Sequence, residues 1–207
     1  MTQMKSDPRM PAPADATGTT PATASYRDPA HFGKQISGDA VRFERLLPGP
    51  VERIWEYLTD SEKRGKWLAS GDMPPRVGAD LTMTFAHANL SPHKAPTPEK
   101  FRKYEPSVDS KHRVLRYEPT RFLSISWGGT GEDRSEVDFE LTPEGDKVRL
   151  VVTHRRLGSR GEMVNVSGGW HTHLAILEEK LNDRVPPSFW TLFGDIEERY
   201  EGRFPVN

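Results

Sequence analysis

Three segments that alternate apolar and polar residues are the feature that most constrains how this chain can fold. They are RFLSISW (121–127), EVDFEL (136–141) and KVRLVVTH (147–154). The turn sequence PEGD joins the last two, which indicates a hairpin. Alternation with one charged face is typical of antiparallel strands that are buried on one side only. We therefore expect an antiparallel sheet with a single apolar face.

Other segments extend this pattern on both sides. AVRFERLL (40–47), LTMTFAH (81–87) and RVLRYEP (113–119) also have the character of strands. Between the first two, PVERIWEYLTD (50–60) places its apolar residues on one helical face, and a shorter helix with Ser61 as its N-cap follows. Residues 88–112 hold four prolines and many charges, and they are predicted to be an irregular excursion.

The C-terminal part has helical spacing. Trp170, Leu174, Leu177 and Leu181 follow one another at intervals of four, three and four residues, which predicts a long helix with one apolar stripe. Gly168-Gly169 is interpreted as the tight turn into this helix. The order of elements predicts an α+β fold in which a curved antiparallel sheet wraps round the helix. A concave space between sheet and helix is a common place for a small molecule.

The N-terminal part has a different composition. Residues 10–25 contain twelve Pro, Ala or Thr in sixteen positions and no large aliphatic residue except Met10 at the start. Such a segment cannot bury enough surface to offset the entropy lost on ordering. We therefore predict a disordered tail over residues 1–37 and a single domain over residues 38–207. The domain includes a C-terminal helical extension at about 187–204.

Composition limits the classes of function. With 29 basic and 30 acidic residues and no basic stripe, nucleic acid is not an expected partner. No apolar run approaches the ~18 residues of a membrane span, and the N-terminus lacks the apolar core of a signal peptide, so a cytoplasmic protein without membrane insertion is expected. The absence of cysteine excludes disulfides, thiolate nucleophiles and Cys-ligated zinc.

Three segments carry a resemblance to a known superfamily. VRFERLLPGPVERIWEYLTDSEKRGKWLA, RSEVDFELTPEGDKVRLVVTHRRL and GGWHTHLAILEEKL together resemble bacterial SRPBCC proteins of the START and birch-pollen-allergen superfamily. The branch to which they are similar is related to the C-terminal domain of activators of the 90-kDa heat-shock protein ATPase. The resemblance runs from about residue 39 to the end of the chain. It implies a helix-grip fold with an apolar cavity between the sheet and the C-terminal helix.

The resemblance implies less about chemistry, because fold does not determine function. Our first expectation is a module that binds a hydrophobic or amphipathic small molecule in the cavity without a cofactor. Two alternatives stay open: an enzyme of polyketide cyclase/dehydratase or hydrolase type that uses cavity histidines, and a chaperone-associated interaction module. A homodimer also stays open. The excursion over residues 88–112 is a candidate flap over the cavity mouth.

The histidines are the candidate polar groups of the cavity. His171 and His173 point about 200° apart on a helix, so they cannot share one metal ion, and His171 is expected to face solvent or to lie in the first turn of the helix. His173 lies at the edge of the apolar stripe, and strand parity places His87 and His154 on inward faces. Each of these three either faces a ligand or is satisfied by backbone or water. No carboxylate at a suitable spacing joins them, so no metal site is predicted.

The tryptophans are core residues or cavity walls, since both have the same sequence signature. No GxSxG motif or other activated nucleophile is present, and no catalytic residue is assigned. Under the enzymatic alternative, His154 and His173 are the acid–base candidates. The predicted ligand-binding residues are Trp67, Phe85, His87, Trp127, His154, Trp170, His173 and Leu177.

Overall fold

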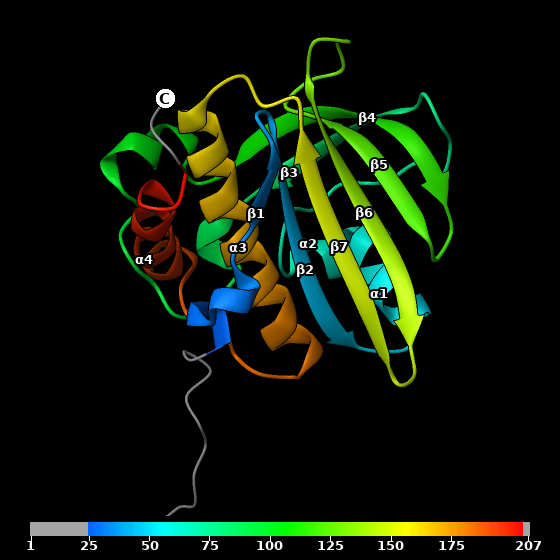
Figure 1. Ribbon diagram of the computed structural model, residues 1–207, viewed down its shortest axis with the longest axis horizontal. Coiled ribbons are helices and arrows are strands. Elements are labelled where there is room, and N and C mark those ends of the chain that lie inside the picture. Colours follow the sequence, from blue (N-terminus) through cyan, green and yellow to red (C-terminus); the bar gives the residue numbers. More distant parts are fainter. Residues whose placement is uncertain (1–24, 205–207) are drawn as a thin grey trace, which may run out of the picture.

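The computed structural model describes residues 25–204 (Figure 1). The strands are β1 (Lys34–Ser37), β2 (Ala40–Pro48), β3 (Asp80–Phe85), β4 (Val108–Glu118), β5 (Phe122–Trp127), β6 (Ser135–Glu144) and β7 (Lys147–Arg155). The helices are α1 (Val51–Thr59), α2 (Ser61–Gly65), α3 (Arg160–Leu181) and α4 (Phe189–Glu201). Within the described residues the strands form one antiparallel sheet in the order β1-β2-β7-β6-β5-β4-β3.

The sheet has the predicted apolar inner face. In the β6–β7 hairpin, Phe139 lies opposite Val152 and Leu141 opposite Leu150, and all four side chains are buried. The long helix α3 packs on this face, where Trp170 contacts the ring of Phe139 edge-on at 5.6 Å. Figure 1 shows α3 along the sheet and α4 on the side of α3 that faces away from most of the strands. The predicted α+β helix-grip fold is confirmed.

The start of α3 differs from the expectation. The helix begins at Arg160, so Gly168 and Gly169 lie inside it and are not the turn that leads into it. Two capping hydrogen bonds set the start: the side chain of Ser159, the N-cap, accepts from the Glu162 N–H, and the Glu162 carboxylate accepts from the N–H of Gly158, the residue before the cap. Met163 and Val164 are already buried in the first turns of α3, and the glycine pair that follows them is what made the helix look as if it began later.

The two short helices lie where the sequence predicts them. α1 buries Ile54, Trp55 and Leu58. The predicted N-cap of α2 is wrong by one residue, because the Asp60 carboxylate accepts the hydrogen bond from the Lys63 N–H at 2.8 Å. The Ser61 hydroxyl accepts instead from the Gly71 N–H at 2.8 Å, which ties α2 to the loop that follows it.

The predicted tail is ordered in its C-terminal part. Residues 25–37 form two 3-10 turns, Ser25–Arg27 and Pro29–His31, followed by β1, which pairs with the start of β2. Tyr26 and Phe32 supply the apolar surface that the preceding Pro/Ala/Thr-rich stretch lacks, and both are buried. Residues 1–24 lie outside the described part of the chain.

The predicted excursion is shorter than expected, because β4 already begins at Val108. The chain before it contains two 3-10 turns, His87–Asn89 and Glu99–Tyr104, and packs along α4 (Figure 1). The ring of Phe101 stacks on that of Trp190 with their centroids 5.3 Å apart, and the Ser91 hydroxyl donates to the Pro186 carbonyl at 2.6 Å. This segment and α4 together cover one end of α3.

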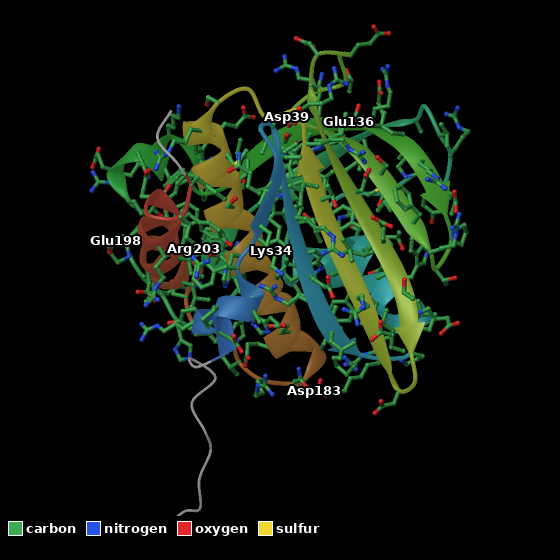
Figure 2. All side chains as sticks on the ribbon, in the orientation of Figure 1. Lys34, Asp39, Glu136, Asp183, Glu198 and Arg203 are labelled. Atoms are coloured by element: carbon green, nitrogen blue, oxygen red, sulfur yellow. The ribbon has the colours of Figure 1, made fainter. Side chains whose placement is uncertain are left out.

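Charged side chains mark the ends of the molecule. Figure 2 shows Asp39 and Glu136 at one end and Asp183, just beyond α3, at the opposite end. Glu136 lies at the start of β6, and β5 and β7 end and α3 begins toward the same side. The end marked by Glu136 is therefore where the C-terminal half of β5 meets the N-terminal half of α3.

Candidate functional site

A cavity of about 390 Å³ lies between the sheet and the helices near this end. β3, β4 and β5 form one side of it, α3 and α4 the other, and the segment before β4 contributes at its edge. The side chains and glycine that line it are Leu68, Phe85, His87, Phe101, Tyr104, Val108, Asp109, Ser110, Trp127, Asn165, Val166, Gly169, Trp170, His173, Phe189, Trp190 and Phe193. A cavity of this size is within the range of small-molecule sites, roughly 300–1,000 Å³.

The walls are aromatic and nearly uncharged. Trp127 and Trp170 face one another with ring centroids 4.9 Å apart, and Phe189 and Trp190 meet edge to face at 4.9 Å. Among the described lining residues, Asp109 carries the one formal charge, and its exposed carboxylate accepts a hydrogen bond from Thr84 at 2.7 Å. Asp109, Asn165 and Tyr104 are exposed, so the cavity opens to solvent on their side. An uncharged ligand fits such walls better than an ion does.

His173 is a polar group of the buried wall. Its Nδ1 lies 2.6 Å from the carbonyl oxygen of Trp67, so Nδ1 carries the proton and donates it. Burial lowers the pKa of His173 to about 3, with the neighbouring His87 as a smaller cause. The ring is therefore neutral near pH 7, and its Nε2 bears a lone pair.

His87 lies beside His173, with ring centroids 5.4 Å apart. The strand-parity basis for His87 is wrong, because β3 ends at Phe85 and His87 begins a 3-10 turn. The turn nevertheless places its ring on the cavity, 4.2 Å from that of Phe189. Burial lowers the pKa of His87 to about 4, so this imidazole is also neutral near pH 7.

His154 lies on the inner face of β7, as strand parity predicts, but it does not line the cavity. Its Nδ1 accepts a hydrogen bond from the indole N–H of Trp170 at 3.0 Å, and its Nε2 lies 2.9 Å from the Ser135 hydroxyl. Burial lowers the pKa of His154 to about 3. Both nitrogens are satisfied within the protein, so the structure does not bring His154 and His173 together at one cavity atom.

The prediction that His171 faces solvent or lies in the first turn of the helix is wrong, because the residue is buried and the helix begins at Arg160. His171 is fully buried, and its Nε2–H donates to the Tyr26 carbonyl at 2.8 Å. Its Nδ1 lies 3.0 Å from the Tyr200 hydroxyl, which also accepts from the Gly33 N–H at 2.6 Å. The reason is that α4 and the segment before β2 cover the face of α3 opposite the sheet, so α3 has two buried sides.

The other candidates divide in the same way. Phe85, Trp127 and Trp170 line the cavity. Trp67 and Leu177 are fully buried but lie outside its lining, and the Trp67 indole N–H donates to the Tyr57 carbonyl at 2.8 Å. Five of the eight predicted residues thus meet at the cavity, while Trp67, His154 and Leu177 belong to the core around it.

Sequence reasoning missed the wall that α4 supplies. Phe189, Trp190 and Phe193 form an apolar face of an amphipathic helix, and a pattern of this kind shows that a face is buried without showing what it packs against. Phe101 comes from the excursion that was expected to be a flap, and it does reach the cavity edge. The sequence signal that could have indicated this wall was the apolar face of the helix near the C-terminus together with the aromatic residue Phe101 in the excursion.

Two further observations concern metals and membranes. Residues 25–204 contain no group of three or more His, Asp or Glu side chains placed to hold a metal ion. None of the described helices combines the length and the apolar character that crossing a bilayer requires.

The chain is similar to several known proteins. The family model described as "Activator of Hsp90 ATPase homolog 1-like protein" matches residues 48–182. The solution structure of the protein encoded by gene BPP1335 of Bordetella parapertussis is 44% identical, with a TM-score of 0.71, over 84% of this chain and 91% of that one.

More distant solved structures share the fold alone. The crystal structure of CalU16 from Micromonospora echinospora is 23% identical, with a TM-score of 0.56, over 79% of this chain and 86% of that one. A protein of unknown function, EF2215 from Enterococcus faecalis, is 16% identical, with a TM-score of 0.60, over 86% of this chain and 93% of that one. No curated protein matches the chain. The match over residues 48–182 and the 44% identity to the Bordetella protein show that the chain belongs to the family of Activator of Hsp90 ATPase homolog 1-like proteins, within the SRPBCC superfamily.

Proposed function

We propose that this protein binds an uncharged, largely apolar small molecule in the cavity between β3, β4, β5, α3 and α4. The composition of the wall carries the proposal: about 390 Å³ of space is lined mainly by aromatic rings, with its charged group, Asp109, at the exposed edge. Burying apolar ligand surface against such a wall gains about 25 cal/mol per Å² removed from water.

The enzymatic alternative has less support from the geometry. It needs two imidazoles that reach one ligand atom, and His154 is occupied by Trp170 and Ser135 behind the cavity wall. The two imidazoles that line the cavity, His87 and His173, have pKa values lowered by burial to about 4 and about 3, which makes both weak bases near neutral pH.

The chaperone alternative needs an exposed apolar patch away from the cavity. The large exposed apolar side chains of the described residues come from separate strands, loops and turns, and no two of them are neighbours in the sequence. They are Ile36, Leu46, Val77, Tyr104, Leu115 and Val185. Single exposed apolar side chains are ordinary on a soluble surface, so they give a protein partner little support.

Gly169 allows a sharp test of ligand binding. A Cβ added at Gly169 meets no atom within 4 Å, and the residue lines the cavity. A leucine there extends into the ligand space and also removes the cost of a helical glycine, about 1 kcal/mol. Gly169→Leu is therefore expected to fold at least as stably as the wild type and to lose ligand binding.

The experiment combines native mass spectrometry of protein purified from its host with thermal shift against a library of neutral aromatic compounds. We expect a compound that raises the Tm of the wild type and leaves that of Gly169→Leu unchanged. A ligand at 100 times its Kd stabilises the folded state by about 2.7 kcal/mol. The proposal fails if no compound copurifies and none shifts the wild type more than the filled variant.

A further inference from the structure

The tautomer of His173 is fixed by its neighbour on α2's connecting loop. A carbonyl oxygen can only accept a hydrogen bond, and Nδ1 of His173 lies 2.6 Å from the Trp67 carbonyl. The proton therefore resides on Nδ1, and Nε2 is left as an acceptor. The low pKa of His173 agrees with a ring that stays neutral in this position.

Nε2 of His173 is open to the cavity. His173 lines the cavity, and although the residue as a whole is only 5% exposed, its Nε2 is accessible. Within residues 25–204 it also has no hydrogen-bond partner. The wall thus presents a hydrogen-bond acceptor, held in position by the bond on the other side of its ring.

The surroundings of Nε2 set the charge of the group that can meet it. The rings of His87 and Phe189 flank the imidazole of His173, with centroids 5.4 Å and 4.8 Å from the centroid of its ring. None of the described lining residues is a lysine or arginine. An anionic oxygen would meet a lone pair there, without a cation to compensate its lost hydration. A neutral hydroxyl instead donates a hydrogen bond to Nε2.

The rest of the wall sets the shape. Trp127, with Phe85 beside it at 5.8 Å, forms a flat surface on the sheet side, Trp170 forms one on the α3 side, and Phe189 and Trp190 do so on the α4 side. Planar aromatic molecules gain offset-stacked or edge-to-face contacts with such rings beyond simple burial.

We infer that the ligand is an uncharged aromatic molecule with a hydroxyl group. His173 selects this molecule because its Nε2 accepts a hydrogen bond from the ligand's hydroxyl group. This inference rests on the proposed function and adds the chemical class and the residue that recognises it.

The test compares three probes of one ring system: 2-naphthol, its methyl ether and 2-naphthoate. Affinities are measured at pH 7 by tryptophan fluorescence quenching and checked by calorimetry. We expect naphthol to bind about tenfold more tightly than the ether, the difference of a single hydrogen bond to a buried acceptor. Naphthoate is expected to bind more weakly than the ether.

Two variants separate recognition from support. In His173→Asn, the amide nitrogen takes the position of Nδ1 and can still donate to the Trp67 carbonyl, but nothing replaces Nε2. We expect the naphthol-to-ether ratio to fall to about one, while the affinity for the ether stays within about threefold. His154→Gln is the matched control: it alters an equally buried imidazole outside the cavity and is expected to keep the tenfold ratio.

The outcomes are distinct. If naphthol and its ether bind the wild type equally, the inference is overturned and the proposed function stands. If naphthoate binds most tightly, the inference is overturned together with the proposal that the ligand is uncharged. A naphthol preference that survives in His173→Asn also overturns the assignment of His173. If neither naphthol nor its ether binds the wild type, the inference is overturned, and the proposed function is then decided by copurification and the thermal-shift library.

Discussion

The indole Nε1–H of Trp170 donates a hydrogen bond to Nδ1 of His154 at 3.0 Å, between the sheet and α3. His154 in turn lies 2.9 Å from the Ser135 hydroxyl through Nε2. This imidazole therefore joins α3 to β6 and β7, and it lies outside the cavity that Trp170 lines. A histidine that looked like a cavity group in the sequence is a structural connection of the core.

Replacing His154 by leucine tests this structural role. The variant leaves the Trp170 N–H donor and the Ser135 hydroxyl oxygen, which accepts from Nε2, without their partner, and a buried polar group that loses its partner costs about 1–3 kcal/mol. We expect urea denaturation to show a loss of about 2–3 kcal/mol in the free energy of unfolding. The exposed His93 provides the control, His93→Leu, for which a change within about 0.5 kcal/mol is expected. Equal stability of the two variants would contradict the role given to His154.

Tyr200→Phe tests the connection between the N-terminal segment and the helices. The Tyr200 hydroxyl lies between the Gly33 N–H and Nδ1 of His171, so its removal leaves both without a partner. We expect a loss of about 1–3 kcal/mol in stability and faster amide hydrogen exchange over residues 25–37. Tyr104→Phe, at an exposed tyrosine, is expected to change neither quantity. Unchanged exchange in Tyr200→Phe would show that the segment is held by other contacts.

Acid is expected to destabilise the fold through its buried histidines. Burial lowers the pKa of His87 and His112 to about 4 and that of His154, His171 and His173 to about 3, from an ordinary value of 6.5. Below pH 6.5 the unfolded chain therefore binds more protons than the folded protein, and stability falls as the pH falls toward 4. Each group contributes a slope of up to about 1.4 kcal/mol per pH unit in this window.

The measurement is the free energy of unfolding in urea between pH 7.5 and 4.5. His154→Leu lacks one of these groups, so its free energy of unfolding is expected to fall less steeply with pH than that of the wild type. The two slopes are expected to differ by up to about 1.4 kcal/mol per pH unit, which corresponds to one proton. Comparing the two slopes removes the contribution of the carboxylates, which both proteins share. Parallel curves would mean that His154 titrates normally in the folded state.

The two adjacent glycines of α3 are expected to respond differently to alanine. At Gly168 a Cβ lies 3.2 Å from Cε2 of Phe193 and 3.4 Å from Cβ of Glu197, so α4 approaches α3 closely there. At Gly169 it meets nothing within 4 Å. Gly169→Ala is expected to raise the stability by about 0.5–1 kcal/mol through helix propensity alone. Gly168→Ala is expected to be less stable than Gly169→Ala, because α4 must shift. Scanning calorimetry of both variants measures this order, and the reverse order would contradict the close approach.

The fold was readable from the sequence because its strands alternate cleanly and because the three segments resemble a known superfamily. Phe139, Leu150 and Val152 needed only parity to be placed on the inner face. His171 was misplaced because a single apolar stripe reports one buried side of a helix, whereas the second side is created by Tyr26 and Tyr200, far away in the sequence. Long-range packing of this kind leaves no local pattern.

The cavity was predictable in part for the same reason. Trp127 and Trp170 were expected at a core or a cavity, and which of the two applies depends on how α4 and the segment before β4 close over them. Whether a buried histidine can meet a cavity group depends on its hydrogen bonds. Both ring nitrogens of His154 form hydrogen bonds with core residues, while His173 uses one nitrogen to bind the Trp67 carbonyl. Such partners are chosen by the tertiary structure.

The position of α4 affects what relatedness to this protein can mean. The family match ends at residue 182, whereas Phe189, Trp190 and Phe193 complete the cavity from beyond that boundary. The segment that secures α4 through Tyr200 lies before residue 48, on the other side of the matched region. A likeness confined to residues 48–182 therefore describes the sheet and α3 around the cavity, whereas the size and chemistry of its remaining wall are written in flanking sequence that such a likeness does not reach.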